Sequence, residues 1–195
     1  MDNSGSFGGY LEVIMKKLMR RSIALLMMLV MIMAAASVAV SAKTVSKTVK
    51  KQKFTTSTKA IEKKAVKVKK GTTKLNVKKG QGYVRFVAPK TKTYTFTFSK
   101  CTSSMRSSNG YVTFMRKDAG SPQYSYSFNT KLKTKGGKDN TLWLSVNGAD
   151  FSSNSNLLSR PLSSRSGKIK LKKGESIYMY LYFGGYPTKT KLVIK

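Results

Sequence analysis

The sequence contains no histidine, a single cysteine and only seven acidic residues among 195 positions. The absence of histidine excludes imidazole-based catalytic triads and most zinc sites. Few and scattered carboxylates disfavour a glycosidase-type acid pair, although Asp139 and Asp150 could approach each other in space. We therefore expect no catalytic residue, bound metal or cofactor. A Ser–Lys dyad stays open as a route to an enzyme of unrecognised type, because serine and lysine are both abundant.

The single cysteine, Cys101, leaves no partner for an intrachain disulfide. A domain exported without disulfides must be held together by its hydrophobic core. About 125 residues, from position 71 onward, are enough for one such core. We expect Cys101 to behave as a small, part-buried apolar residue.

Long apolar runs are also scarce, and residues 23–40 form the one present. It is preceded by four basic residues and followed by small ones, Val40-Ser41-Ala42. A basic segment, an apolar segment and small residues at a cleavage site are typical of a secretory signal peptide. We interpret 15–42 as that signal, with cleavage after Ala42. Residues 1–14 show no helical period, and we interpret them as an extension from a start codon assigned too early, the true start being Met15.

The alternative is a permanent membrane anchor. The apolar run 23–40 has 18 residues, which is at the lower limit for a membrane-spanning helix of about 20. The taper toward small residues before Ala42 favours cleavage, but both interpretations place the following chain outside the cytoplasm.

Basic residues greatly outnumber acidic ones in the chain that follows Ala42. Four of the 38 basic residues and two of the seven acidic ones precede Ala42, so the chain after it has a net charge of +29. Such an excess bears on partners and solubility rather than on fold. We expect anionic cell-wall polymers or polysaccharides as partners, with an anionic membrane surface as a further one, and no specific nucleic acid.

Residues 43–70 hold eleven lysines and one acid, Glu62. Because this segment offers few apolar side chains to bury, we predict a flexible basic tether. A helical turn over 60–65 is the one regular element expected in it.

From residue 71 to residue 195, short runs of alternating polarity are separated by turn residues. The runs are predicted at 73–77, 83–87, 94–98, 110–115, 124–128, 142–146, 168–171, 176–183 and 191–194. A period of two residues with this spacing indicates an all-β fold, here an antiparallel β-sandwich of about nine or ten strands. Residues 147–167 are predicted to form a long loop, and loops of that length are usually functional or disordered.

Several of these runs carry a family pattern. Residues 83–89 read Tyr-Val-Arg-Phe-Val-Ala-Pro, residues 94–98 read Tyr-Thr-Phe-Thr-Phe, and a Gly-containing turn precedes the aromatic strand at 176–183. Over about residues 75–195 the chain resembles bacterial pre-peptidase C-terminal domains. The resemblance implies a jelly-roll-like, non-catalytic sandwich of secreted or surface proteins. Some members of that family bind calcium through clustered acids. In this chain Asp150 is the one carboxylate of such a cluster, beside asparagines, and calcium prefers several charged oxygens, so we do not expect a calcium site here.

Two sets of side chains are candidates for ligand binding. In 176–183, Tyr178, Tyr180 and Tyr182 point to one face of the strand. They form either a platform on which sugar rings stack or a ladder that covers the outer side of a sheet. Trp143 points away from Leu142 and Leu144, either as an exposed ligand contact or as a half-buried plug beside the long loop.

The second set is basic and consists of six lysines expected at strand faces and turns: Lys78, Lys79, Lys168, Lys170, Lys172 and Lys173. Lysines protect exposed sheet edges from aggregation, but that role does not account for so large a charge excess. We therefore predict an exported, non-enzymatic protein that associates electrostatically with anionic envelope polymers. A carbohydrate-binding module that uses Trp143 and the tyrosines is the alternative.

Overall fold

The computed structural model describes residues 12, 15–19, 22, 44–55, 57–104, 108–116 and 130–195. The chain forms two compact units, Met1–Ser41 and Ala42–Lys195. In the first, the described residues are helical and Lys16 pairs with Glu12 at 2.7 Å. Within the described residues, every helix is too short or too polar to cross a membrane. The predicted apolar run 23–40, cleavage after Ala42 and the strand at 124–128 lie outside the described residues.

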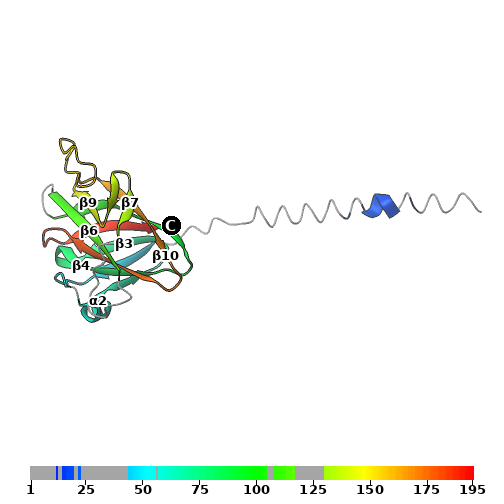
Figure 1. Cartoon of the computed structure of the whole chain (residues 1–195), viewed down its shortest axis with the longest axis horizontal. Helices are drawn as coiled ribbons and strands as arrows, with labels where there is room; N and C mark the ends of the chain where they lie inside the picture. Colours follow the sequence, from blue (N-terminus) through cyan, green and yellow to red (C-terminus); the bar gives the residue numbers. More distant parts are fainter. Residues whose placement is uncertain are drawn as a thin grey trace, which may run out of the picture. The chain divides into compact units, whose positions relative to one another are not determined.

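The second unit is an all-β sandwich, as predicted (Figure 1). In spatial order, one sheet contains β1 (Val45–Val49), β3 (Gly71–Val77), β12 (Thr188–Ile194), β5 (Lys92–Ser103), β10 (Ser164–Leu171), β7 (Leu132–Thr134) and β8 (Gly137–Asp139). The other contains β2 (Val66–Val68), β4 (Gln81–Val87), β11 (Ser176–Tyr182), β6 (Ser108–Arg116) and β9 (Thr141–Val146).

The alternation that predicted the strands also builds the core between the two sheets. Phe96 and Phe98 of β5 point inward, whereas Thr95 and Thr97 point outward. The ring of Phe96 contacts those of Phe86 and Phe114 from the opposite sheet, both at a centroid distance of 5.5 Å with edge-to-face geometry. Such aromatic pairs add stability beyond the area they bury.

Two strand boundaries differ from the prediction. The last strand begins at Thr188 rather than at residue 191, because Thr188 and Thr190 are buried in the sandwich while Lys189 and Lys191 alternate outward. The long loop is also shorter than expected. Strand β10 begins at Ser164, where small polar residues pair with Ser99 and Thr97 of β5. The polarity of Ser164 and Ser166 had concealed a strand whose outer face is solvated.

The prediction of a flexible tether was wrong for the described residues 44–55 and 57–70, which we call the N-terminal arm. Strand β1 pairs in parallel with β3, and β2 pairs in parallel with β4. Between them, helix α2 (Thr58–Lys64) confirms the expected helical turn and is capped by the Ser57 side chain. The side chains of Val49, Ile61 and Val68 are at most 5% exposed. Three well-placed apolar residues and two sets of backbone hydrogen bonds therefore order a lysine-rich segment.

The arm passes from one sheet to the other by crossing β4 at Gly82. A Cβ atom at Gly82 would lie 2.5 Å from the carbonyl oxygen of Lys50 and 2.7 Å from Cγ1 of Val49. Only glycine leaves room for so close an approach of the two backbones. Beyond this crossing, the Gln52 side chain donates a hydrogen bond to the Ala60 carbonyl, and α2 lies beside β4 (Figure 1).

Candidate functional site: a lysine face on the seven-stranded sheet

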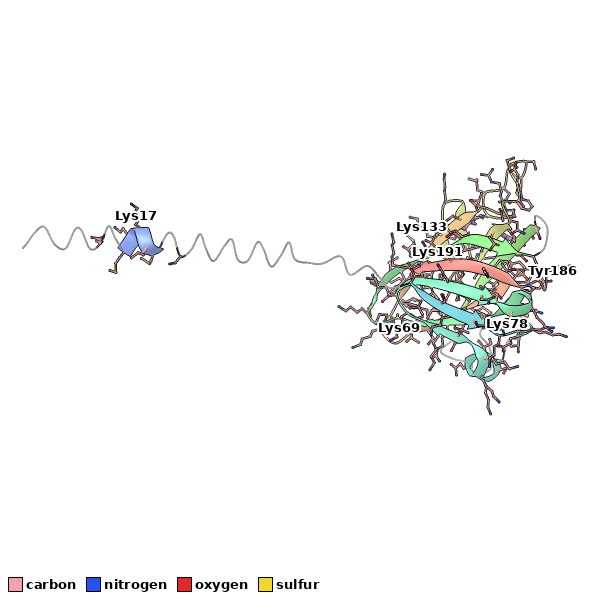
Figure 2. The ribbon with its side chains drawn as sticks, turned by 180° about the vertical axis from the view of Figure 1, so that it is seen from behind. Lys17, Lys69, Lys78, Lys133, Tyr186 and Lys191 are labelled. Carbon is pink, nitrogen blue, oxygen red and sulfur yellow. The ribbon has the colours of Figure 1, made fainter. Side chains whose placement is uncertain are left out.

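The outer face of the seven-stranded sheet presents two groups of lysines, one on β3 and β12 and one on β10, β7 and β8, with threonine and serine side chains of β5 between them. Strands β3, β12, β10 and β7 each alternate buried inward residues with exposed or half-exposed outward ones, and the short strand β8 pairs with β7 at the edge of the sheet. We call this surface the lysine face and define it by Lys74, Lys133, Lys138, Lys168, Lys170, Lys189 and Lys191. Figure 2 labels Lys133 and Lys191, which come from strands far apart in the sequence.

Among the described residues of the unit Ala42–Lys195, no Asp or Glu side chain lies on the lysine face. Asp139 of β8 lies on the core side of the sheet, because it pairs with the buried Leu132 and directly paired residues share one side. Glu62 is held on α2, and Glu175 forms an ion pair with Arg116 at 2.9 Å in a turn. Asp150 lies in the loop after β9, where its carboxylate accepts hydrogen bonds from Ser152. The positive charges of the face are therefore not neutralised by neighbouring acids of the described chain.

The strand register places like charges beside one another. Lys168 pairs with Lys133, which pairs in turn with Lys138, so three lysines stand side by side across three strands. Lys191 pairs with Lys74 on the other side of the sheet. Directly opposed like charges destabilise a sheet, so the arrangement costs stability unless an anion lies between them.

The six lysines predicted from the sequence do not form one cluster. Lys168 and Lys170 lie on the lysine face, whereas Lys172 and Lys173 lie in the turn after β10. Lys78 and Lys79 form the short helix η1 (Lys78–Gly80). These two turns lie at opposite ends of β5, since Leu171 pairs with Lys92 while Thr188, the partner of Val77, pairs with Ser103.

Sequence reasoning missed the other five members of the face. Lys189 lay outside every predicted strand, Lys191 was only the first residue of the one at 191–194, and Lys133 and Lys138 lie on three-residue strands too short to show a period. Lys74 alternates with the buried Thr73 and Leu75, and that local signal was available. No local sequence pattern could show that β3, β12, β10 and β7 lie in one sheet.

Of the two alternatives for the tyrosines, the structure favours a ladder that covers the outer side of the sheet over an exposed platform at Tyr178 and Tyr180. Both point to the outer face of the five-stranded sheet, as expected, but they are 0% and 3% exposed. The N-terminal arm covers them. Ile61 of α2 packs in the same cluster, and the ring of Phe54 meets that of Tyr180 at 5.3 Å. A flexible tether would have left this face open, so the order of the arm decides between the two alternatives.

Hydrogen bonds fasten the arm to these tyrosines. The Tyr178 hydroxyl donates to the Glu62 carboxylate at 2.5 Å, and the Tyr83 hydroxyl bonds both the N–H and the carbonyl of Thr55. Burial, followed by the bond to Glu62, raises the pKa of Tyr178 to about 12. The phenol therefore stays a neutral donor throughout the physiological range, and its role is structural.

A half-buried aromatic row remains at one end of the same sheet face. Tyr182 of β11 pairs with Tyr111 of β6, which pairs with Trp143 of β9. All three side chains are partly exposed, and neighbouring ring centroids are 5.2 Å apart. The structure thus unites Tyr182 with Trp143 through Tyr111, a residue that sequence reasoning did not single out.

Cys101 is buried, 5% exposed, and its thiol donates to the Thr190 hydroxyl at 3.3 Å. The expectation of a small buried residue is confirmed. Burial raises the pKa of this thiol from 9.0 to about 11. Within the described residues, no three His, Cys, Asp or Glu side chains lie close enough to hold a metal ion.

We expect Cys101 to resist alkylation in the folded protein at pH 8 and to react fully in guanidinium chloride, because the thiolate is the reactive form. The folded state favours the protonated thiol, so this contribution to stability is complete below pH 9 and is lost as pH rises toward 11. Denaturant melts across that window should show the stability difference between the native chain and Cys101→Ala changing. A thiol that reacts at pH 8 without unfolding contradicts this account.

Comparisons with known proteins do not assign the chain to a family. No family model matches it, and no curated protein matches it. Membership of the pre-peptidase C-terminal family therefore stays a prediction. Among solved structures, this chain is similar to CorA, a surface-associated copper-binding protein of Methylomicrobium album BG8. The sequence identity is 6% and the TM-score is 0.36, and the match covers 78% of this chain and 98% of CorA.

Proposed function

We propose that this chain is an exported, non-enzymatic protein that binds anionic envelope polymers through the lysine face. The observation that supports this most directly is a sheet face with seven lysines and, among the described residues of the unit Ala42–Lys195, no Asp or Glu side chain. The signal-like segment supports export, and the absence of histidine supports a binding role over catalysis.

The position of the lysines argues against edge protection as their main role. Natural sheets place lysines on edge strands to prevent aggregation. Strand β12, however, lies between β3 and β5, and β10 lies between β5 and β7. Lys168, Lys170, Lys189 and Lys191 therefore stand in the interior of the sheet, where no edge needs protection.

The geometry suits an extended polymer. Neighbouring strands are about 4.8 Å apart, and alternate residues along one strand are about 6.8 Å apart. A face built on that grid offers cations at intervals comparable to the spacing of charged groups along a polyanion. Binding of this kind releases condensed counterions, so affinity should fall steeply as salt rises.

The test is a pelleting assay of the unit Ala42–Lys195 with purified cell wall across a salt series. One variant combines Lys74→Gln, Lys189→Gln and Lys191→Gln on the lysine face. A matched control combines Lys59→Gln, Lys63→Gln and Lys64→Gln on α2, which removes the same charge elsewhere. Each lysine near an anionic surface is worth about 1 kcal/mol, so the face variant should bind roughly tenfold or more weaker.

The control variant should lose much less affinity, and its salt dependence should stay close to that of the native chain. Equal losses in both variants would show that net charge acts without a defined face. Salt-independent binding would contradict electrostatic association.

A second function is favoured by the aromatic row of Trp143, Tyr111 and Tyr182, on which sugar rings could stack. In the same assay, binding that resists salt and is lost in Trp143→Ala supports it. Tyr186→Ala is the matched control, since this exposed tyrosine lies in the β11–β12 turn, outside the row. A native chain that binds neither wall nor polysaccharide contradicts both functions.

A further inference from the structure

One end of the lysine face deepens into a hollow of about 530 Å³. Its floor and sides come from β7, the first half of β10 and the last part of the loop between β9 and β10. Lys133 and Lys168 belong to both the hollow and the lysine face, so the two surfaces are continuous. Ser164 and Ser166 add hydroxyl groups to its lining.

The hollow is strongly cationic. Five basic side chains and no acidic one line it: Lys133, Lys135, Arg160, Arg165 and Lys168. Two carboxylates lie in the neighbourhood outside the lining. Asp139 interacts with Arg165, and Asp150 interacts with Arg160. Two nearby acids against five basic groups leave a net positive charge, concentrated in a concave site where the field is focused.

Arg165 is a fixed part of this site. It is 5% exposed, and its guanidinium donates to the carbonyls of Leu157, Leu158 and Arg160. Its charge is therefore held in place, and carbonyl dipoles rather than a carboxylate are its direct partners. Burial lowers the pKa of Arg165, the expected direction for a cation removed from water.

Arg160 supplies donor capacity that the described chain does not use. Its Nε is buried and has no hydrogen-bond partner among the described residues. A buried donor without a partner destabilises the folded state, so such groups usually have a partner such as a water molecule or an ion. Beside it, the adjacent pair of Lys133 and Lys168 repel each other unless an anion bridges them.

We propose that this hollow binds one tetrahedral oxyanion group, a phosphate or sulfate ester, carried by the polymer that lies on the lysine face. The proposal rests on the proposed function and names the chemistry of its ligand. A phosphate monoester or a sulfate ester has three non-bridging acceptor oxygens in a tetrahedral arrangement, against two coplanar ones on a carboxylate. It can therefore engage arginine, lysine and serine donors that converge from three segments of the chain.

The experiment compares three polymers prepared at similar charge density: dextran phosphate, dextran sulfate and polyglutamate. The hollow variant is Arg160→Gln with Lys133→Gln, and the face control is Lys189→Gln with Lys191→Gln. We expect the hollow variant to lose roughly fivefold or more affinity for the two ester polymers relative to polyglutamate, because charge-assisted bonds to the ester are lost. The face control should weaken all three alike. A larger effect on one ester polymer identifies which ester is bound.

A hollow variant that weakens all three polymers equally, or none of them, overturns the proposal. If Arg160→Gln prevents folding, Lys133→Gln with Lys135→Gln changes two exposed side chains and gives the same comparison. A native chain that binds none of the polymers would contradict the proposed function but not yet the hollow. Inorganic phosphate then tests the hollow alone: saturable shifts of the Ser164 and Ser166 amide resonances support it, and their absence overturns it.

Discussion

Deleting residues 43–70 is expected to prevent the remaining chain, 71–195, from folding. The deletion removes the partners of β3 and β4 and the buried side chains of Val49, Ile61 and Val68. Full burial of each aliphatic side chain contributes roughly 1.5–3 kcal/mol. Their sum is comparable to the whole stability of a typical domain, about 5–15 kcal/mol. The deletion also uncovers Tyr178 and Tyr180.

The measurement is thermal unfolding by circular dichroism of 71–195 beside 43–195. A less drastic variant, Ile61→Ala, should cost about 2–5 kcal/mol because it leaves a cavity under α2. Lys63→Ala, exposed on the same helix, should be near neutral and serves as the matched control. A shortened chain that melts cooperatively at the temperature of the longer one would restore the idea of an independent tether.

Replacing Arg165 by methionine is expected to destabilise the protein and to release the loop before β10. Three carbonyls lose a charged donor, and hydrogen bonds to charged groups are each worth about 1.5–3 kcal/mol, part of which water recovers. A net loss of about 3 kcal/mol corresponds to a fall in Tm of about 6–12 °C for a unit of this size.

Arg165→Lys separates charge from geometry, because an ammonium cannot reproduce the planar fork that reaches three carbonyls. We expect it to behave like the methionine variant. Limited proteolysis should then cleave between residues 147 and 163 in both variants, but not in Lys135→Met, which alters an exposed residue of the same hollow. Native-like melting of Arg165→Met would show that the loop is held by other contacts, such as the pairing of Leu162 with β9.

The fold class was predictable because strand patterning is local. Tyr94, Phe96 and Phe98 alternate with threonines, and this alternation identifies both the strand and the face that enters the core. Ser164 and Lys189 show where the method fails. Their neighbours resemble loop or turn residues, and pairing with distant strands, β5 for Ser164 and both β3 and β5 for Lys189, makes them part of strands.

The candidate sites were predictable only in part. Lys168, Lys170, Tyr182 and Trp143 do reach partly or fully exposed surface. Tyr178 and Tyr180 do not, because their exposure depended on a segment more than a hundred residues away. The hollow beside β7 could not be anticipated, since it requires β7, β10 and the intervening loop to converge.

The sequence by itself determined an all-β chain with a large positive charge, few acids, no histidine and an export-type N-terminus, because composition and a period of two residues are properties of local segments. Only the tertiary structure decided which strands are neighbours. That choice collected the lysines of five strands on one face, drew the basic arm into both sheets and buried the tyrosines. The physical reason is that strand pairing and burial depend on contacts between distant residues, which no single segment records.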